Sequence, residues 1–166
     1  AFALGTVLNN KPNIRMVLLK YIKSNGFIFF TNLNSLKGRS FIKNPNLSMC
    51  FYWESLNKQI RILGKGVVLD DFKSDEYFAS RPRGSQIGAW VSNQSSKISS
   101  KKILMKKEAE FKNKFDGFSV PRPKHWCGIK IKPNEFEFWQ QGEFRLHDRE
   151  LFKLNKNVWV RQLLSP

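Results

Sequence analysis

The chain has 166 residues, of which 41% are hydrophobic and 14% are aromatic. This length suits one domain with a buried core, and this composition excludes an intrinsically disordered chain. Lysine and arginine number 29 against 13 aspartate and glutamate residues, which gives a formal net charge of +16. Such an excess indicates anionic partners, which include nucleic acid, a membrane surface and phosphorylated small molecules. The charge alone does not choose among them.

The first half of the chain predicts a series of strands. Short runs rich in β-branched and aromatic residues alternate with turn-forming residues, as in the predicted turn at 23–26. The expected strands cover residues 1–8, 14–22, 26–32, 47–53 and 59–70. Between the third and fourth strands, the stretch SLKGRSFIKN at 35–44 predicts a short helix with Ser35 as its N-cap.

The middle of the chain changes to helical patterns. Residues 70–80 predict a helix that Pro82 ends, and a second helix is expected to begin at Pro82, because proline is favoured at the first helical position. Residues 96–115 predict a third helix, whose lysines are expected to form a solvated face. After a linker at 119–126 that contains two prolines, strands are expected again at 127–133, 135–141, 145–154 and 157–163.

This order of elements predicts the fold class. Many short antiparallel strands with helices inserted in the middle favour a mainly-β fold, a closed or split Greek-key-like barrel. No apolar run has the length of a membrane span, and no signal peptide is visible. The sequence begins without Met, inside a predicted strand, which indicates a part of a longer protein.

The two cysteines and two histidines argue against a metal site. Cys50 and Cys127 lie in apolar, aromatic surroundings and lack the spacing of a metal-binding or redox motif. Without a Cys/His cluster, we expect no structural or catalytic zinc. Buried, reduced thiols are the expectation instead, which is consistent with a cytoplasmic protein.

The stretch RLHDR at 145–149 is the strongest candidate site. Arg145, His147 and Arg149 recur at every second position, so a strand would place their side chains on one face. Such a cluster is costly without an anion, although neighbouring carboxylates can neutralise part of the charge: Glu143, Asp148 and Glu150. Phe138 and Trp139 offer flat surfaces nearby for a planar ligand. We therefore interpret this region as a binding site for a planar anion.

Two other stretches predict anion sites. Thr31, Ser35 and Lys37 surround the start of the short helix, where N–H groups, hydroxyls and an ammonium can bind phosphate. Simple capping by Ser35 is an equal alternative. Arg81 and Ser85 would place a guanidinium and a hydroxyl at the start of the second helix, unless this is an arginine-rich surface loop.

One residue and two short stretches carry no clear signal from the residues alone. Tyr77 is equally compatible with the core. The run IRMVLLK at 14–20 favours a strand whose charged ends reach solvent, and Gln94 and Ser95 favour a loop without a function.

Together these stretches resemble the pyridoxamine 5'-phosphate oxidase family. The family signature is a Glu-aromatic-Trp-Gln run, four spacer residues and then Arg-Leu-His-Asp-Arg, which stands here at 137–140 and 145–149. The stretches RMVLLK, FFTNLNS, RPRGSQIGAWVSNQSS and the terminal LSP also match in order, so the resemblance covers essentially the whole chain. The family's N-terminal segment, part of which folds over the substrate, is absent from this sequence.

The resemblance implies a fold, an activity and an assembly. Residues 1–166 would form a single FMN-binding split-barrel domain, and two copies would make a homodimer with FMN at the subunit interface. The expected activity is oxidation of pyridoxamine or pyridoxine 5'-phosphate to pyridoxal 5'-phosphate, with neither nucleic acid nor membrane as a partner. Hydride would pass from the substrate C4' to flavin N5, and O2 would then reoxidise the flavin to give H2O2.

The resemblance also implies site residues. Contacts to FMN fall on Arg15, Met16, Val17, Leu18, Leu19, Lys20, Thr31, Lys37, Gln59, Gln94, Ser95, Trp139 and Arg149. Contacts to the substrate fall on Lys20, Tyr77, Arg81, Ser85, Arg145 and His147. Of these, Arg145 and His147 are the catalytic candidates, and they would orient and polarise the pyridine ring.

One departure and two rival functions remain at this point. Leu36 stands where the family usually carries an arginine, so FMN is expected to lose one phosphate ligand, at a cost of about 1.5–3 kcal/mol unless another cation compensates. The first rival is a flavin- or pyridoxal-phosphate-binding relative with weak or different activity. The second is a basic barrel that binds nucleic acid, for which the charge and the interleaved aromatic residues are suited.

Overall fold

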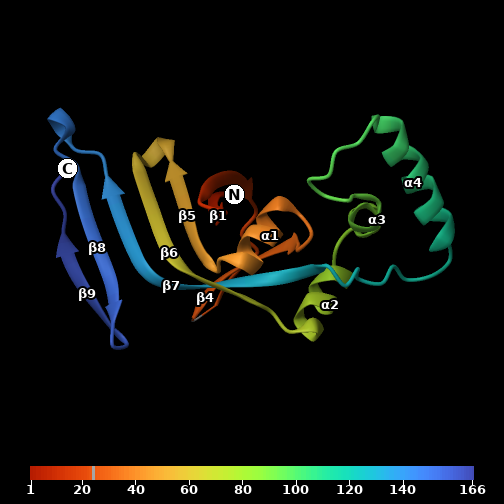
Figure 1. The fold of residues 1–166 in the computed structure, drawn as a ribbon. Helices are drawn as coiled ribbons and strands as arrows, with labels where there is room; N and C mark the ends of the chain where they lie inside the picture. Colours follow the sequence, from red (N-terminus) through yellow and green to blue (C-terminus); the bar gives the residue numbers. More distant parts are fainter. Residues whose placement is uncertain (24) are drawn as a thin grey trace. The chain divides into compact units, whose positions relative to one another are not determined.

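The structure is a computed structural model that describes residues 1–23 and 25–166 (Figure 1). Ser24, within the turn expected at 23–26, lies outside the described residues. The strands are β1 Phe2–Leu8, β2 Lys11–Val17, β3 Tyr21–Lys23, β4 Gly26–Asn32, β5 Asn46–Trp53, β6 Lys58–Val68, β7 Trp126–Gln140, β8 Asp148–Asn155 and β9 Val158–Leu163. The α-helices are α1 Leu36–Lys43, α2 Asp71–Ala79, α3 Arg83–Val91 and α4 Lys101–Lys114. Two 3-10 turns lie at Glu54–Leu56 and Glu143–Arg145.

The predicted elements are present in the structure, but the helix expected at 96–115 begins only at Lys101, and the predicted strands differ at three places. The strand expected at 14–22 is divided between β2 and β3, with Leu18–Lys20 outside both. The strands expected at 127–133 and 135–141 are one strand, β7, which continues through Pro133. The φ that the proline ring imposes also occurs in extended backbone. The strand expected at 145–154 begins only at Asp148.

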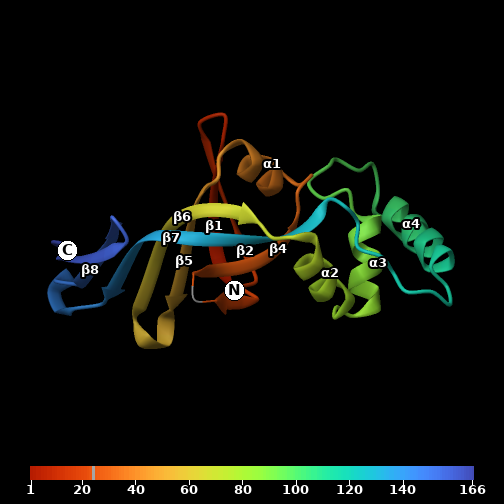
Figure 2. The same ribbon diagram turned by 90° about the horizontal axis from the view of Figure 1, so that it is seen from below.

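The sheet is antiparallel in every strand pair whose register is described. Its order is β2-β1-β5-β6-β7-β4-β3, and β8 pairs with both β7 and β9. Asn9–Asn10 and Lys156–Asn157 connect the hairpins β1–β2 and β8–β9, and all four residues have positive φ. Two-residue loops of this conformation match the twist of the flanking strands, which is why asparagine is favoured there. Figure 2 shows β5 and β6, whose register runs from Asn46↔Lys65 to Trp53↔Lys58, side by side.

The chain forms two compact units. The first contains residues 1–29, 40–67 and 130–166, and the second contains residues 30–39 and 68–129. The first unit is built on the sheet, and its most buried side chains are Phe2, Leu4, Met49, Ile62 and Ile131. Phe2 meets Phe29 edge to face, with 6.0 Å between the ring centroids.

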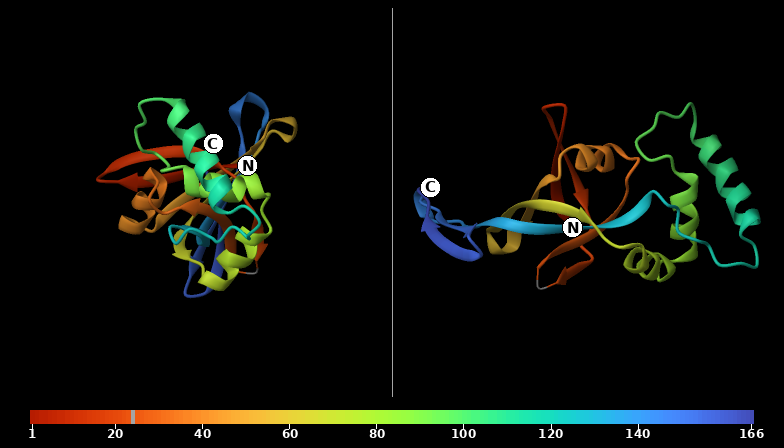
Figure 3. Two further views of the ribbon diagram at one scale, coloured as in Figure 1. Left: turned by 90° about the vertical axis from the view of Figure 1, so that its right-hand side faces the viewer. Right: turned by 60° about the horizontal axis from the view of Figure 1, so that its bottom comes forward.

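The second unit packs helices around the first residues of β7. Its core contains Phe78 of α2, Ile87 and Val91 of α3, and Trp126. Helices α3 and α4 pack side by side (Figure 3). Asp70 caps α2 by accepting a hydrogen bond from Lys73 N, and α3 begins directly after Pro82. Proline is therefore the residue before the first helical position rather than the first position itself.

Candidate functional site

The start of α1 brings together three residues predicted to contact FMN. Lys37 Nζ lies 2.9 Å from Gln94 Oε1 and 3.4 Å from Ser35 Oγ. Ser95 Oγ accepts a hydrogen bond of 3.1 Å from Leu36 N. The loop at 94–95 thus lies against the helix start, although it is 57 residues further along the chain than Lys37. We call this group the α1 cradle: Ser35, the N–H of Leu36, Lys37, Gln94 and Ser95.

Ser35 is fully buried and caps α1 as predicted. Its Oγ accepts a hydrogen bond from Gly38 N at 3.2 Å and donates one to Asn32 O at 2.6 Å. The capping alternative is therefore confirmed for Ser35, whose single hydroxyl hydrogen is used within the chain. An ammonium, hydroxyls and helix N–H groups are the donors that a phosphate monoester requires.

Two local features of this unit are costly without a ligand. Ser95 has a φ of 70°, in the left-handed region that few serines adopt. The Oγ1 atom of Thr31, another predicted FMN contact, is buried without a hydrogen-bond partner among the described residues. A buried hydroxyl left in this way costs about 1–3 kcal/mol. Ser35 Oγ and the N–H of Leu36 already donate within the chain. The groups of the α1 cradle that suit a bound phosphate are therefore the ammonium of Lys37 and the hydroxyl of Ser95.

Two residues predicted to contact the substrate phosphate lie at the end of α2 and just after it, Tyr77 within the helix and Arg81 beyond its C-cap. The guanidinium carbon of Arg81 lies 4.6 Å from the centroid of the Trp126 ring and 5.3 Å from that of Phe78. Tyr77 stacks on Phe30, with 3.9 Å between the ring centroids. Burial lowers the pKa of Arg81 from its ordinary value, and its Nη1 atom is buried without a hydrogen-bond partner in the described part of the chain.

Ser85 lies close to these residues in the chain but on the next helix. It occupies the first turn of α3, where its backbone N–H donates to Pro82 O at 2.8 Å. Its side chain is exposed, as expected for a group that meets a ligand at a helix start. Tyr77 and Arg81 are thus in contact with the same aromatic cluster, and Ser85 lies in the first turn of the following helix.

The first unit contains a pocket of about 700 Å³ on β6, β7 and β8. Three predicted FMN contacts line it together: Gln59, Trp139 and Arg149. The indole of Trp139 and the side chains of Leu56 and Phe138 supply apolar surface, while the amide and guanidinium supply hydrogen bonds. Such a mixture suits a planar heterocycle with polar edges.

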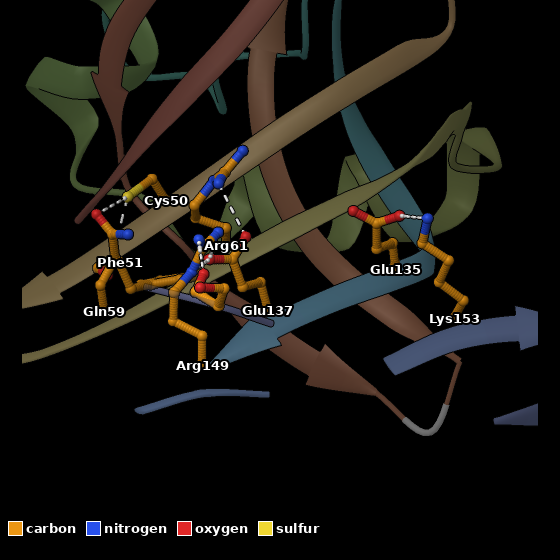
Figure 4. Close-up of polar contacts among 9 residues, drawn as sticks. Cys50, Phe51, Gln59, Arg61, Glu135, Glu137, Arg149 and Lys153 are labelled. Carbon is orange, nitrogen blue, oxygen red and sulfur yellow. Dashed lines mark hydrogen bonds and ion pairs between the residues drawn. The ribbon is translucent and has the colours of Figure 1, made fainter. Parts of the chain in front are cut away.

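The sequence interpretation of Arg149 needs a correction. Glu137, which is 7% exposed, accepts hydrogen bonds on Oε1 from Arg149 Nε at 3.0 Å and Nη2 at 2.8 Å. Its Oε2 accepts one from Arg61 Nη1 at 2.8 Å (Figure 4). The anion next to Arg149 is therefore a carboxylate of the chain itself. Glu150, named as a possible neutraliser, pairs instead with Arg161 at 2.7 Å.

Strand register explains these partners. Arg149 lies opposite Trp139, so it shares a face with Glu137 two residues away on β7. Glu150 is the next residue along β8 and points to the other face. Sequence reasoning missed Arg61 and assigned no role to Glu137. Two features of the sequence pointed to these residues. Arg61 stands two residues after Gln59, and Glu137 is part of the family motif at 137–140.

Arg145 and His147 are not on a strand, so the alternation argument was wrong for them. Arg145 ends the 3-10 turn Glu143–Arg145, and β8 begins after His147. Gly142 permits this turn, because a Cβ there would lie 1.9 Å from Leu146 O. His147 Nδ1 accepts a hydrogen bond of 3.2 Å from Gly142 N, and its ring centroid lies 4.8 Å from that of Trp139. A neutral His147 therefore carries its proton on Nε2.

The predicted FMN contacts at 15–20 lie elsewhere in the first unit. Arg15, Met16 and Val17 are on β2, and Leu18, Leu19 and Lys20 follow it. Arg15 donates to Leu4 O at 3.0 Å and to Thr6 Oγ1 at 2.8 Å, and burial lowers its pKa. In the sheet order, β1 and β5 lie between β2 and the β6 strand that carries Gln59.

Two properties of the described residues bear on other functions. They include no group of three or more His, Cys, Asp and Glu side chains arranged to hold a metal ion. Among the described helices, none combines the length and the apolar character that a membrane span requires.

Comparison with known proteins identifies the family. Residues 1–115 match the family model of pyridoxamine 5'-phosphate oxidase, and residues 126–166 match the C-terminal dimerisation region of pyridoxine 5'-phosphate oxidase. A pyridoxine/pyridoxamine 5'-phosphate oxidase of Actinobacillus succinogenes is 48% identical over 95% of this chain and 75% of its own length. One of Zymomonas mobilis is 42% identical over 100% of this chain and 87% of its own length.

Solved structures agree on the fold. PhzG of Burkholderia lata, solved with tetrahydrophenazine-1-carboxylic acid, has a TM-score of 0.93 and 29% identity, covering 100% of this chain and 82% of its own. A pyridoxamine 5'-phosphate oxidase-related, FMN-binding protein of Nostoc punctiforme has a TM-score of 0.76 and 16% identity, covering 99% of this chain and 87% of its own. The predicted split-barrel fold is confirmed. The chain belongs to the pyridoxamine 5'-phosphate oxidase family of FMN-binding oxidoreductases.

Proposed function

We propose that this protein is a cytoplasmic, FMN-dependent oxidase that converts pyridoxamine 5'-phosphate or pyridoxine 5'-phosphate to pyridoxal 5'-phosphate. One observation carries the proposal: the second unit holds two sets of phosphate-type donors on different elements. The α1 cradle is one, and Tyr77, Arg81 and Ser85 at the α2–α3 junction are the other. A cofactor phosphate and a substrate phosphate, each with nearly two negative charges, account for both.

We propose a homodimer with FMN at the subunit interface. Within the first unit, the sheet order separates Arg15–Val17 on β2 from Gln59, Trp139 and Arg149 on β6–β8. A second copy of the chain would allow both sets to meet one flavin. The match of residues 126–166 to a dimerisation region supports this arrangement. We also treat residues 1–166 as a single domain, because β4, β6 and β7 each contribute residues to both compact units.

Bound FMN would supply the redox chemistry by accepting hydride from the substrate and passing electrons to O2, which gives H2O2. The protein's residues would bind and orient. Lys37 and Ser95 would hold the cofactor phosphate, Trp139 would exclude water, and Arg81 would hold the substrate phosphate. Arg145 would lie across the pyridine ring. His147, with Nδ1 bonded to Gly142 N, would offer the Nε2 proton to the 3-hydroxyl.

Peroxide release tests this proposal. Purified protein is mixed with FMN and pyridoxamine 5'-phosphate, and H2O2, ammonia and pyridoxal 5'-phosphate are measured together. We expect equal amounts of the three products and a visible flavin spectrum on the protein. Protein that stays colourless after exposure to FMN, or that yields no peroxide, contradicts the proposal.

Three controls separate the rival functions. The first control tests whether the enzyme requires a phosphorylated substrate, because the similar protein PhzG was solved with a ligand that carries no phosphate. Unphosphorylated pyridoxamine is assayed beside the phosphate ester. We expect a much higher KM for pyridoxamine, because Arg81 then has no phosphate to bind. Steady-state turnover with excess FMN distinguishes an oxidase from a protein that only stores pyridoxal phosphate. Titration with a fluorescent oligonucleotide, which we expect not to bind specifically, tests the nucleic-acid alternative.

A further inference from the structure

Glu137 is a buried acidic side chain to which the proposed function assigns no role. It lies on β7, two residues before Trp139, and its side chain is 8% exposed. A buried carboxylate is costly unless cations and hydrogen bonds compensate it. The groups that contact the Glu137 carboxylate therefore indicate its role.

Two guanidiniums share this one carboxylate. Arg149 binds Oε1 through Nε and Nη2, and Arg61 binds Oε2 through Nη1, all at 2.8–3.0 Å (Figure 4). The cluster carries a formal charge of +1 and joins β6, β7 and β8. A buried ionic group of this kind is weak evidence for a role in stability, because well-packed apolar residues serve that purpose as well. Fixing the direction of a functional cation is a better explanation.

Arg149 is held from its other side as well. Its Nη1 donates to Ser165 O at 2.9 Å, and its backbone O accepts from Leu164 N at 3.0 Å. Of the five N–H donors of an arginine, three are thus directed at fixed partners. The plane of the guanidinium is set, and two donors remain for a ligand in the pocket that Arg149 lines with Gln59 and Trp139.

We infer that Glu137 is a positioning residue, which fixes the guanidinium of Arg149 in the orientation that binds the cofactor and acts only through Arg149. The inference rests on the proposed function, since it requires FMN in this pocket. Replacement by glutamine keeps the shape of the side chain but not its charge. The amide can accept from Arg149 or from Arg61, while its NH2 group would face the other guanidinium. Arg149 would then lose its fixed direction.

The test is the dissociation constant of FMN, measured by flavin fluorescence on the full chain. We expect Glu137→Gln to weaken FMN binding about 10- to 100-fold, the usual effect of losing a charge-assisted contact. Glu135→Gln is the matched control, because Glu135 lies two residues earlier on β7 and pairs with Lys153 at 3.4 Å. We expect this control to bind FMN like the wild type.

A double-mutant cycle separates positioning from an independent effect. In an Arg149→Gln background, Glu137→Gln should cause no further loss of FMN affinity, because its effect passes through Arg149. Additive losses overturn the inference, and so does a Glu137→Gln variant that binds FMN as tightly as Glu135→Gln. A wild-type chain that binds no FMN contradicts the proposed function instead, which keeps the two failures distinct.

A second variant covers the case in which Glu137→Gln does not fold. Glu137→Asp keeps the charge but shortens the side chain by one methylene group, so the carboxylate reaches Arg149 less well. We expect a folded protein with FMN affinity between those of the wild type and Arg149→Gln. Unchanged affinity in Glu137→Asp, with Glu137→Gln unfolded, overturns the inference.

Discussion

The guanidinium of Arg81 lies over the indole ring of Trp126, with 4.6 Å between its carbon and the ring centroid. Phe30 lies nearly parallel to Trp126 at 5.2 Å, and Tyr77 stacks on Phe30. Ring faces stabilise a cation without neutralising it. Because no ion pair of Arg81 occurs within the described ranges, its full charge is available to a phosphate.

Replacing Arg81 should therefore affect substrate binding more than turnover. We expect Arg81→Gln to raise the KM for pyridoxamine 5'-phosphate about 10- to 100-fold and to change kcat by no more than about threefold, since a phosphate remote from the reacting carbon is bound equally in the ground and transition states. Lys73→Gln is the control, because Lys73 lies on α2, the helix that precedes Arg81, and pairs with Asp70 at 2.9 Å. An unchanged KM in Arg81→Gln would remove Arg81 from the phosphate site.

A gain of cofactor affinity is expected from Leu36→Arg. Leu36 is the first residue of α1, and its N–H belongs to the α1 cradle. A guanidinium there would add a charge-assisted contact of about 1.5–3 kcal/mol to a bound phosphate, which corresponds to about 10- to 100-fold tighter FMN binding. Without ligand, a cation at a helix N-terminus is unfavourable by about 0.3–1 kcal/mol.

Comparing FMN with riboflavin, which lacks the phosphate, shows whether Leu36→Arg acts on the phosphate. Both flavins are titrated against wild type and Leu36→Arg, and the dissociation constants are obtained from fluorescence quenching. We expect the gain for FMN alone, and a small loss of thermal stability in the unliganded variant. Equal gains for riboflavin would show that position 36 does not face the phosphate.

Local sequence signals predicted the parts of the site that depend on local structure. Ser35 caps α1, and Arg81 precedes the helix that follows Pro82, because capping and proline chemistry act over a few residues. The partner of Arg149 was not predictable in this way. It depends on the register between β7 and β8, which places Glu137, and not Glu150, on the same face of the sheet as Arg149. Likewise, the contact between Lys37 and Gln94 joins residues far apart in the chain.

The wrong strand assignment for Arg145 and His147 has a similar physical cause. Alternating charges predicted a strand, but Gly142 and two left-handed residues, Phe144 and Arg145, form a turn instead. Non-glycine residues seldom adopt positive φ, so residue pattern alone gives little indication of it. The turn nevertheless leaves Arg145 exposed, which a ligand-binding role requires.

Loss of Arg145 should reduce turnover without releasing the cofactor. We expect Arg145→Ala to lower kcat/KM by about 100-fold or more, the usual cost of removing one polarising group, while the FMN dissociation constant changes by less than about twofold. Because Arg145 has a φ of 66°, Arg145→Asn provides a second variant that tolerates this backbone conformation. Near-normal turnover in both variants would show that Arg145 does not contact the reacting ring.

The buried thiol of Cys127 should make stability depend on pH in the alkaline range. Cys127 is 3% exposed, and burial raises its pKa from 9.0 to about 11. Below pH 9 both the folded and the unfolded chain keep this proton, so the thiol adds no pH dependence. Between pH 9 and 11 the unfolded chain releases the proton and the folded chain retains it, which lowers the free energy of unfolding by up to about 3 kcal/mol.

Urea unfolding of the wild type and Cys127→Ala, at a series of pH values from 7 to 11 with a reducing agent present, measures this effect. The other ionisable groups are the same in both proteins, so their contributions cancel in the difference. We expect the free energy of unfolding of the wild type to fall more steeply than that of Cys127→Ala between pH 9 and 11, and the two slopes to agree below pH 9. Parallel curves across the whole range would mean that the folded chain exposes this thiol to solvent, contrary to its burial in the structure.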